Sequence, residues 1–270
     1  MTGRHASRFF MYLFLTIVSF LSVFPLAWMA ISATNTNFDI IAGSLVPGRN
    51  LAENFRNLQA ATNLGTAFYN SVRNTVLLTA LSILICSFAG YGFEVYHSKA
   101  KDKLMGFLLL SMMVPFAAIM IPLFRLTADW GLLNSLMGFM LPTLATPFLI
   151  MFFRQSTRQF PLEIIEAARM DGVSEIGIFF RMYIPTMKST YAAAITITFL
   201  AAWNSFLWPR VVFLTQDSVT LPLMISNLVA GYITDNGVVM LAVLITTLPT
   251  IVVFFFLQRH FAEGIIGSVK

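Results

Sequence analysis

The polar stretch at residues 154–189 holds the side chains best suited to chemistry at a surface. Nine charged residues, five basic and four acidic, lie in it, out of 17 Lys and Arg and 12 Asp and Glu in the whole chain. Glu163 and Glu166 follow Pro161, which suits the first position of a helix, and acidic groups near a helix start complement the helix dipole. We therefore expect a helix that begins at Pro161 with charged groups near its start.

A glycine divides this stretch into two predicted helices. The first runs through Ala167 to Met170 and ends at Gly172, because glycine most easily adopts the left-handed conformation that follows a helix. The second begins with Ser174 as its cap, and Pro185 ends it. Its apolar residues recur at i, i+3, i+4, i+7 and i+8 and form one face: Ile176, Phe179, Phe180, Tyr183 and Ile184. Together the two helices form a knuckle, residues 161–185, that a partner could grip; a solvated loop lying on a bilayer is the alternative.

The rest of the chain lacks the patterns of an enzyme or of a metal site. His5, His97 and His260 fall near segment ends without metal-ligand spacing, and the single cysteine lies in an apolar run. No Gly-x-x-x-x-Gly-Lys-Ser/Thr loop is present, so the chain is not expected to hydrolyse ATP. Despite a net charge of +5, Lys and Arg do not cluster with aromatic residues, which argues against nucleic acid. We predict no catalytic residue, no metal ion and no cofactor bound by this chain.

The composition indicates that lipid surrounds the elements that position the knuckle. The chain is 57% hydrophobic and 11% charged, against about 45–50% and about 25% in soluble domains. Roughly 20 apolar residues cross a bilayer as a helix. Six stretches qualify, at residues 9–31, 74–93, 104–124, 134–153, 190–209 and 238–257. The predicted fold is therefore an all-α membrane protein, with one transmembrane domain over residues 1–270, six helices and a cytoplasmic loop at 154–189.

Lys and Arg fall unevenly on the two sides of these spans. Twelve of the 17 lie before the first span, between spans two and three, between spans four and five, or after the last span, and five lie on the opposite side. Because cytoplasmic loops retain Lys and Arg, both termini and the knuckle should be cytoplasmic. The loops at 32–73 and 211–237 should then be external.

The predicted spans themselves contain no Asp, Glu, Lys, Arg or His. Proton-driven carriers usually place ionisable groups within the membrane, so a self-powered carrier is disfavoured, although sodium coupling through carbonyls and hydroxyls stays open. Prolines in the spans predict kinks, either as packing features or as part of a flexing pathway. They are Pro25, Pro115, Pro122, Pro142, Pro147, Pro209 and Pro249.

The spacing within the knuckle resembles the permease subunits of ATP-binding-cassette (ABC) importers. Their cytoplasmic signature is Glu-Ala-Ala, three residues, Gly, nine residues, then Ile-x-Leu-Pro. The matching positions here are Glu166, Ala167, Ala168, Gly172 and Pro185, with the conservative changes Met182 for Ile and Ile184 for Leu. Nearly the whole chain is similar to the carbohydrate, maltose-type branch. The residues that carry this wider similarity include Gly131, Leu132, Asn134, Ser135, Phe160, Trp203, Asn204, Phe206, Trp208, Pro209, Gln258, Arg259, Gly264, Gly267, Val269 and Lys270.

This resemblance implies a type I ABC importer permease fold and a set of partners. They are a second, non-identical permease, a cytosolic ATPase dimer that uses ATP and Mg, and an extracytoplasmic solute-binding protein, in a bacterial or archaeal inner membrane. In the family the knuckle seats in a cleft of the ATPase and transmits its closure to the membrane helices. Small alanines allow close approach, and charged side chains can form charge-assisted hydrogen bonds at the rim. The expected ATPase-coupling residues are Glu163, Glu166, Ala167, Ala168, Arg169, Asp171, Gly172, Met182, Ile184 and Pro185.

Aromatic and amide side chains near the external end of the fifth span form a candidate solute pathway. Sugar sites often pair an aromatic ring face with amide hydrogen bonds. An interfacial aromatic belt with an interhelical amide bond is the alternative. The candidates are Trp203, Asn204, Phe206 and Trp208.

These observations predict a non-catalytic transmembrane subunit of an ABC importer. With a second permease it would form the pathway for a sugar or oligosaccharide and couple it to ATP hydrolysis by a separate ATPase. A permease for another polar solute, such as a sugar phosphate or glycerol phosphate, is the first alternative. A self-contained secondary carrier and a membrane enzyme are alternatives from different classes.

Overall fold

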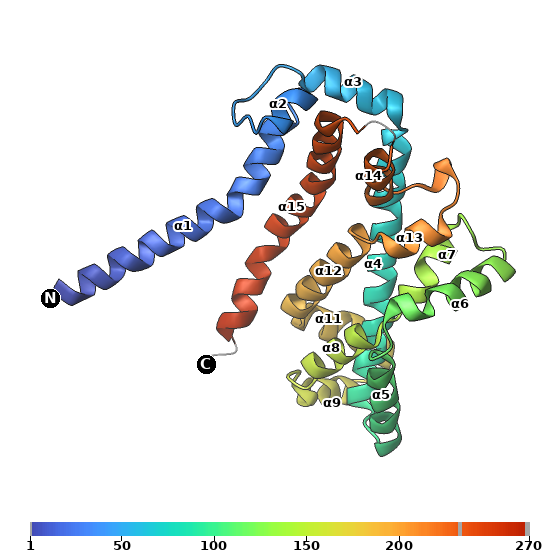
Figure 1. Ribbon diagram of the computed structural model, residues 1–270. Helices are drawn as coiled ribbons and strands as arrows, with labels where there is room; N and C mark the ends of the chain where they lie inside the picture. Colours follow the sequence, from blue (N-terminus) through green and yellow to red (C-terminus); the bar gives the residue numbers. More distant parts are fainter. Residues whose placement is uncertain (1, 232–233, 268–270) are drawn as a thin grey trace. The chain divides into compact units, whose positions relative to one another are not determined.

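The computed structural model describes residues 2–231 and 234–267, and this part of the chain is helical, without strands (Figure 1). Val269 and Lys270, which contribute to the family resemblance, lie outside the described residues. The chain divides into two compact units. The first contains Met1–Leu64 and Met224–Pro249, and the second contains Gly65–Leu223 and Thr250–Lys270.

The first unit joins the ends of its helices through buried amides. It contains α1 (Thr2–Ser32), α2 (Asn37–Ile41), α3 (Leu51–Ala61) and the first part of α15 (Asn236–Gly267). The Asn54 side-chain amide, in α3, donates to the carbonyl oxygens of Ala33 at 2.9 Å and of Asn35 at 3.0 Å. A Cβ added to Gly237 would lie 2.7 Å from Asn54 Nδ2. The start of α15 can approach this amide closely because Gly237 has no side chain.

The second unit is organised along α4 (Leu64–Val95), a helix of 32 residues. Ile83 and Cys86 of α4 share a core with Met105 of α5 and Phe153 of α8. At Gly90 an added Cβ would lie 2.6 Å from Phe153 Cβ, so α4 and α8 cross where α4 has no side chain. The other helices of the unit are α5 (Lys99–Ser111), α6 (Phe116–Asp129), α7 (Leu136–Met140), α8 (Pro147–Thr157), α9 (Leu162–Met170), α10 (Glu175–Ile178), α11 (Ile184–Thr186), α12 (Lys188–Trp203) and α13 (Leu207–Val212). The first residues of α14 (Leu221–Val229) belong to this unit, and the rest, from Met224, belong to the first unit.

Among the described residues, three helices are long and apolar enough to cross a membrane: Ser7–Ser32, Leu64–Val95 and Asn236–Phe256. Two bent pairs raise the number to five if each pair is one span: Lys99–Ser111 with Phe116–Asp129, and Leu136–Thr143 with Pro147–Thr157. They correspond to the spans expected at 9–31, 74–93, 238–257, 104–124 and 134–153. The count of six stays a prediction.

The helix expected at 104–124 is broken more sharply than a proline kink. α5 ends at Ser111, α6 begins at Phe116, and the two are bent by 97°. The residue before a proline is disfavoured in the α conformation, so Val114 interrupts the helix ahead of Pro115. The span at 134–153 is also broken, by 53°, before Pro147, which takes the first position of α8.

The expected span at 190–209 is interrupted as well. α12 ends at Trp203 after 16 residues, and α13 starts only at Leu207. Within a continuous helix Pro209 would disfavour regular geometry, because its ring would clash with the carbonyl of Ser205. In the first turn of α13 its missing N–H costs nothing, since the first amides of a helix have no partner within the helix.

Candidate functional site

The first half of the knuckle ends in a left-handed glycine, as predicted. Gly172 has φ +75°, and its N–H donates to Arg169 O at 3.0 Å. The next amide, Val173 N–H, donates to Ala168 O at 2.9 Å, which completes a Schellman motif. At the other end, Pro161 is the extended residue before α9 rather than its first helical residue. The glycine therefore fixes the corner between the two halves of the knuckle.

The second half of the knuckle differs from the simple helix expected. Ser174 caps it as predicted, because its hydroxyl accepts the Gly177 N–H. A π-helical segment, Phe179–Tyr183, then separates α10 from α11. Pro185 was expected to end the helix, yet it lies within α11. The wider π turn bonds the Ile184 N–H back five residues to Phe179 O, one residue further than in an α-helix.

The π turn also changes which residues of the second half are buried. Phe179 and Tyr183 are buried as expected, together with Ile178, which was not in the predicted face. Ile176 was in that face but is 66% exposed, and Phe180 is also exposed. An α-helical repeat of 3.6 residues does not extend across a π turn, so the predicted face fails at Ile176 and Phe180.

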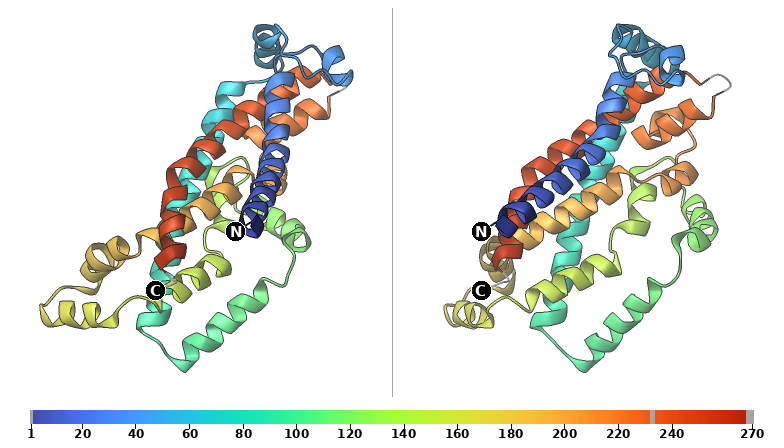
Figure 2. Two further views of the ribbon diagram at one scale, coloured as in Figure 1. Left: turned by 90° about the vertical axis from the view of Figure 1, so that its left-hand side faces the viewer. Right: turned by 60° about the vertical axis from the view of Figure 1, so that its left-hand side comes forward.

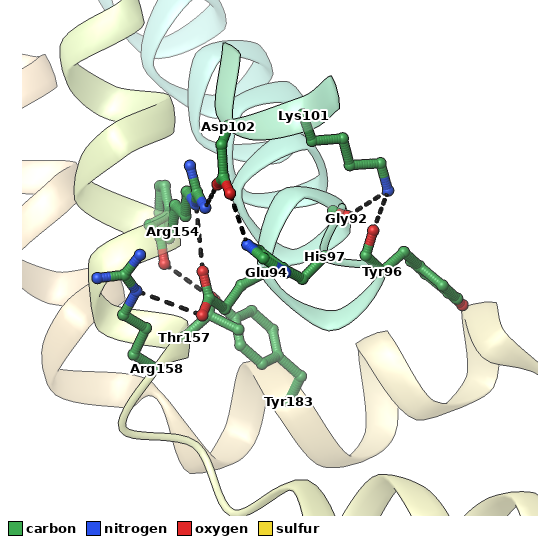
Figure 3. A network of polar contacts seen from close by, with 11 residues as sticks. Gly92, Glu94, Tyr96, His97, Lys101, Asp102, Arg154, Thr157, Arg158 and Tyr183 are labelled. Atoms are coloured by element: carbon green, nitrogen blue, oxygen red, sulfur yellow. Dashed lines mark hydrogen bonds and ion pairs between the residues drawn. The ribbon is translucent and has the colours of Figure 1, made fainter. Parts of the chain in front are cut away.

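Aromatic rings seat the second half of the knuckle on the ends of α4 and α8. The Phe179 ring stacks on Phe88 of α4, with centroids 3.9 Å apart and planes 15° apart. Tyr183 packs against Tyr91 of α4, with centroids 4.9 Å apart. Its hydroxyl shares a buried 2.7 Å hydrogen bond with Thr157 Oγ1 of α8 (Figure 3). These residues form the aromatic anchor (Phe88, Tyr91, Phe179 and Tyr183, with Thr157), which holds the knuckle on α4 and α8.

The predicted coupling residues lie mostly on the open side of the knuckle. Ala168 is buried against the anchor, and Met182 and Ile184 are half-buried. Figure 2 shows the yellow and gold helices of this segment extending from the second unit. Met170 and Ile176 are 89% and 66% exposed on the same segment and were not predicted as contact residues. The exposed coupling residues are Glu163, Glu166, Ala167, Arg169, Asp171, Gly172 and Pro185.

Arg169 has partners within the chain. Its Nε and Nη2 donate to the two carboxylate oxygens of Glu175, at 2.6 and 3.1 Å. The Tyr96 hydroxyl donates to the same carboxylate at 2.5 Å, and the guanidinium lies 5.7 Å from the Tyr96 ring centroid. These hydrogen bonds hold the pKa of the Glu175 carboxyl below its usual value. Those from Arg169 contribute most, and the one from Tyr96 contributes next. Arg169 is one of the expected ATPase-coupling residues, and in the structure its guanidinium is paired with Glu175.

A second polar network ties α4, α5 and α8 together next to the knuckle (Figure 3). Arg154 is only 4% exposed, and it donates to Glu94 at 3.1 Å and to Asp102. Arg158 donates to the other oxygen of Glu94 at 3.3 Å, and His97 lies 2.9 Å from Asp102. Sequence reasoning missed this network. The available signal was that Glu94 and Arg154 border two predicted spans on the same side of the membrane.

The tryptophans of the candidate pathway are buried in the second unit. Trp203 and Trp208 are 2% and 3% exposed, and Trp208 Nε1 donates to Gly138 O at 3.0 Å. Asn204 is exposed at the end of α12, and its amide donates to Leu200 O at 2.9 Å. Phe206 is half-buried, with the Arg210 guanidinium 5.7 Å from its ring centroid. The structure thus separates a buried pair of indoles from an exposed amide.

A partly open cavity of about 520 Å³ lies beside this cluster. Its walls come from α4, the bend between α5 and α6, the break before α8, and α12. The lining is mainly apolar, with hydroxyls from Ser82, Thr143, Thr146, Thr198 and Ser205. The breaks ahead of Pro115 and Pro147 therefore border one cavity.

These features are typical of a membrane-embedded permease. They are the long apolar helices, the broken helices around a cavity, and the charged knuckle held by an aromatic anchor. A family profile identifies the class further. The chain belongs to the binding-protein-dependent transport system inner membrane component family, whose profile matches residues 82–267. This match includes the knuckle, the Arg154 network and α12.

Two curated relatives and one solved structure resemble nearly the whole chain. The lactose transport system permease protein LacG of Rhizobium radiobacter is 45% identical over 259 residues, covering 96% of this chain and 95% of LacG. The arabinooligosaccharides transport system permease protein AraQ of Bacillus subtilis is 32% identical and covers 99% of both chains. A chain of a bacterial ABC transporter involved in alginate import matches with a TM-score of 0.83 at 19% identity, over 97% of this chain and 98% of that one. This likeness shows the ABC importer permease fold.

Proposed function

We propose that the chain is the permease subunit of an ABC importer for a sugar or an oligosaccharide. In this assembly it lines the pathway with a second, non-identical permease and receives its solute from an extracytoplasmic binding protein. A cytosolic ATPase dimer supplies the energy from ATP and Mg. Residues 1–270 act as one transmembrane permease domain in a bacterial or archaeal inner membrane, with both termini cytoplasmic. The names of the relatives LacG and AraQ support the choice of a carbohydrate.

The exposed signature on the knuckle is the observation that carries the coupling role. Glu166 and Ala167 are exposed, and Gly172 leaves open space where a side chain would stand, with nothing within 4 Å of an added Cβ. A partner surface can therefore approach the backbone at this corner. Exposed Met170 and Ile176 add apolar area beside it. Closure of the ATPases moves the knuckle, and the anchor passes that movement to α4 and α8.

Substitutions at this corner test the coupling role. Gly172→Asp or Glu166→Lys should abolish co-purification of the ATPase while membrane insertion stays intact, because each places an unmatched charge in the docking surface. Gly131→Asp is a matched control, since Gly131 also has a positive φ, +67°, and also has nothing within 4 Å of an added Cβ. Co-purification of Gly172→Asp with a fully transport-competent ATPase would contradict the coupling role.

Identifying the solute requires an assay on the complete transporter rather than on this chain alone. The purified permease pair, ATPase and binding protein should show ATP hydrolysis stimulated by one class of solute. A panel of lactose, arabinose oligosaccharides, alginate oligosaccharides and glycerol phosphate separates carbohydrate from phosphorylated solutes. Solute uptake by this chain in liposomes without the ATPase would instead support a secondary carrier.

Asn204 is the member of the predicted pathway cluster best placed to meet a solute, since its side chain is exposed where α12 ends. Trp203 and Trp208 support the surrounding backbone from within the unit. Asn204→Ala should lower the transport rate or alter selectivity among sugars. Unchanged rate and selectivity would remove Asn204 from the pathway.

A further inference from the structure

We propose that Tyr96 and Glu175 are positioning residues for coupling, because with Arg169 they clasp both halves of the knuckle to the cytosolic end of α4. This inference rests on the proposed coupling function and extends it to residues outside the family signature. The clasp is defined as Tyr96, Arg169 and Glu175. None of the three needs to touch the ATPase for the clasp to act.

The geometry joins three separate segments at one carboxylate. Arg169 comes from the last turn of α9, Glu175 is the first residue of α10, and Tyr96 follows the end of α4. Glu175 accepts two hydrogen bonds from Arg169, at 2.6 and 3.1 Å, and one from Tyr96 at 2.5 Å. The Tyr96 ring also lies 5.7 Å from the guanidinium carbon, so it contacts both ions of the pair.

The clasp adds a side-chain restraint to a corner that the backbone holds only through the two hydrogen bonds of its Schellman motif. Gly172 lies between the two halves, and no atom approaches within 4 Å of the position its Cβ would take. The aromatic anchor holds the second half to α4 through Phe179 and Tyr183. The bidentate pair from Arg169 to Glu175 then fixes the angle of the first half, because a planar guanidinium matches a carboxylate in one orientation. Force applied to α9 is thereby delivered to α4.

The clasp should matter more for geometry than for stability. The Arg169 and Glu175 side chains are 39% and 45% exposed. Exposed ion pairs contribute little to folding, because water screens them. Loss of the clasp should therefore leave a folded, assembled transporter whose knuckle moves without moving α4 fully. This combination separates a positioning role from a structural one.

The test measures solute transported per ATP hydrolysed by the complete reconstituted transporter. Tyr96→Phe removes one oxygen, and Glu175→Gln removes the charge while keeping the shape. Both variants should retain the ATPase on co-purification, and each should lower transport per ATP by about two- to fivefold, the range expected for an exposed ionic contact. The double variant should fall no further than Glu175→Gln, because both changes break one link. Tyr12→Phe, which removes the hydroxyl of an exposed tyrosine in α1, is the control.

Transport per ATP equal to that of the unmodified transporter in both single variants would overturn the clasp. The clasp would also be overturned if the variants yielded less assembled complex but the remaining complex transported as much solute per ATP as the unmodified transporter. That result would indicate a structural role alone. Gly172→Asp distinguishes this failure from failure of the proposed function. If Gly172→Asp loses the ATPase while Tyr96→Phe couples fully, the knuckle docks but the clasp does not transmit.

Discussion

Replacing Gly90 by alanine should destabilise the crossing of α4 and α8. The new Cβ would lie 2.6 Å from Phe153 Cβ, 2.7 Å from the Arg154 backbone nitrogen and 2.9 Å from the Ile150 carbonyl oxygen. Two of these atoms belong to the α8 backbone, and the third is fixed directly to it. None can rotate away, so α8 as a whole must shift to accommodate one methyl group.

The expected magnitude follows from two opposing terms. Forcing extra atoms into a packed contact costs about 1–3 kcal/mol. Alanine in place of glycine within a helix returns about 0.5–1 kcal/mol. The free energy of unfolding should therefore fall by up to about 2.5 kcal/mol, which corresponds to a drop in apparent Tm of up to about 10 °C for a unit of this size. A temperature ramp on the detergent-purified protein, read by fluorescence-detected size exclusion, measures this shift.

Gly92 supplies the matched control. It lies in the same helix, two residues further on, and an added Cβ there would meet nothing within 4 Å. Gly92→Ala should leave Tm unchanged or raise it slightly through the gain in helix propensity. If Gly90→Ala is as stable as Gly92→Ala, α4 and α8 do not cross at the distance described, and the packing of the second unit has to be revised.

Three further substitutions test other contacts. Arg154→Met leaves Glu94 and Asp102 without their buried partner and should lower the free energy of unfolding by about 1–3 kcal/mol, a range reduced because both carboxylates are partly exposed; the temperature ramp should show a larger shift than for Arg158→Met. Trp208→Phe removes the hydrogen bond to Gly138 O and should cost about 1–2 kcal/mol without changing the order of preferred solutes in competition uptake. Asn134→Ala places alanine at φ +56° and removes the acceptor for two backbone amides of the loop after α13, so protease cleavage at residues 213–218 should accelerate while α4 stays protected.

The corner of the knuckle was predictable from single residues. Gly172 and Ser174 have local mechanisms, a left-handed backbone and a capping hydroxyl, and both act as the sequence indicates. The π turn was not predictable in the same way, because apolar periodicity assumes 3.6 residues per turn and gives no sign of an inserted residue. Pro185 was the available signal, yet a proline more often ends a helix than widens it.

Five of the six predicted spans correspond to apolar helices or bent helix pairs, and two of those five are broken. Hydropathy locates segments that lipid will accept, but it is insensitive to a 97° bend within an apolar run. Pro115 and Pro147 marked the two breaks, although sequence alone left open whether they were packing kinks or part of a pathway. The Arg154 network was missed because Asp102 and Glu94 lie 52 and 60 residues from Arg154 in sequence, and only the packing of α4, α5 and α8 brings them together.

The π turn also sets a rotational phase along the chain. A π turn holds one residue more than an α turn, and each residue of an α-helix turns the chain by about 100°. The nine residues between Gly172 and Met182 include the start of this turn, so their number decides which way the Glu166 surface faces once α12 is fixed in the membrane. Deleting one residue from Phe179–Tyr183 would change the composition little yet rotate the docking surface by about a quarter turn relative to α12. Under the proposed coupling role, the length of this gap, together with the residues in it, then determines how the docking surface meets the ATPase.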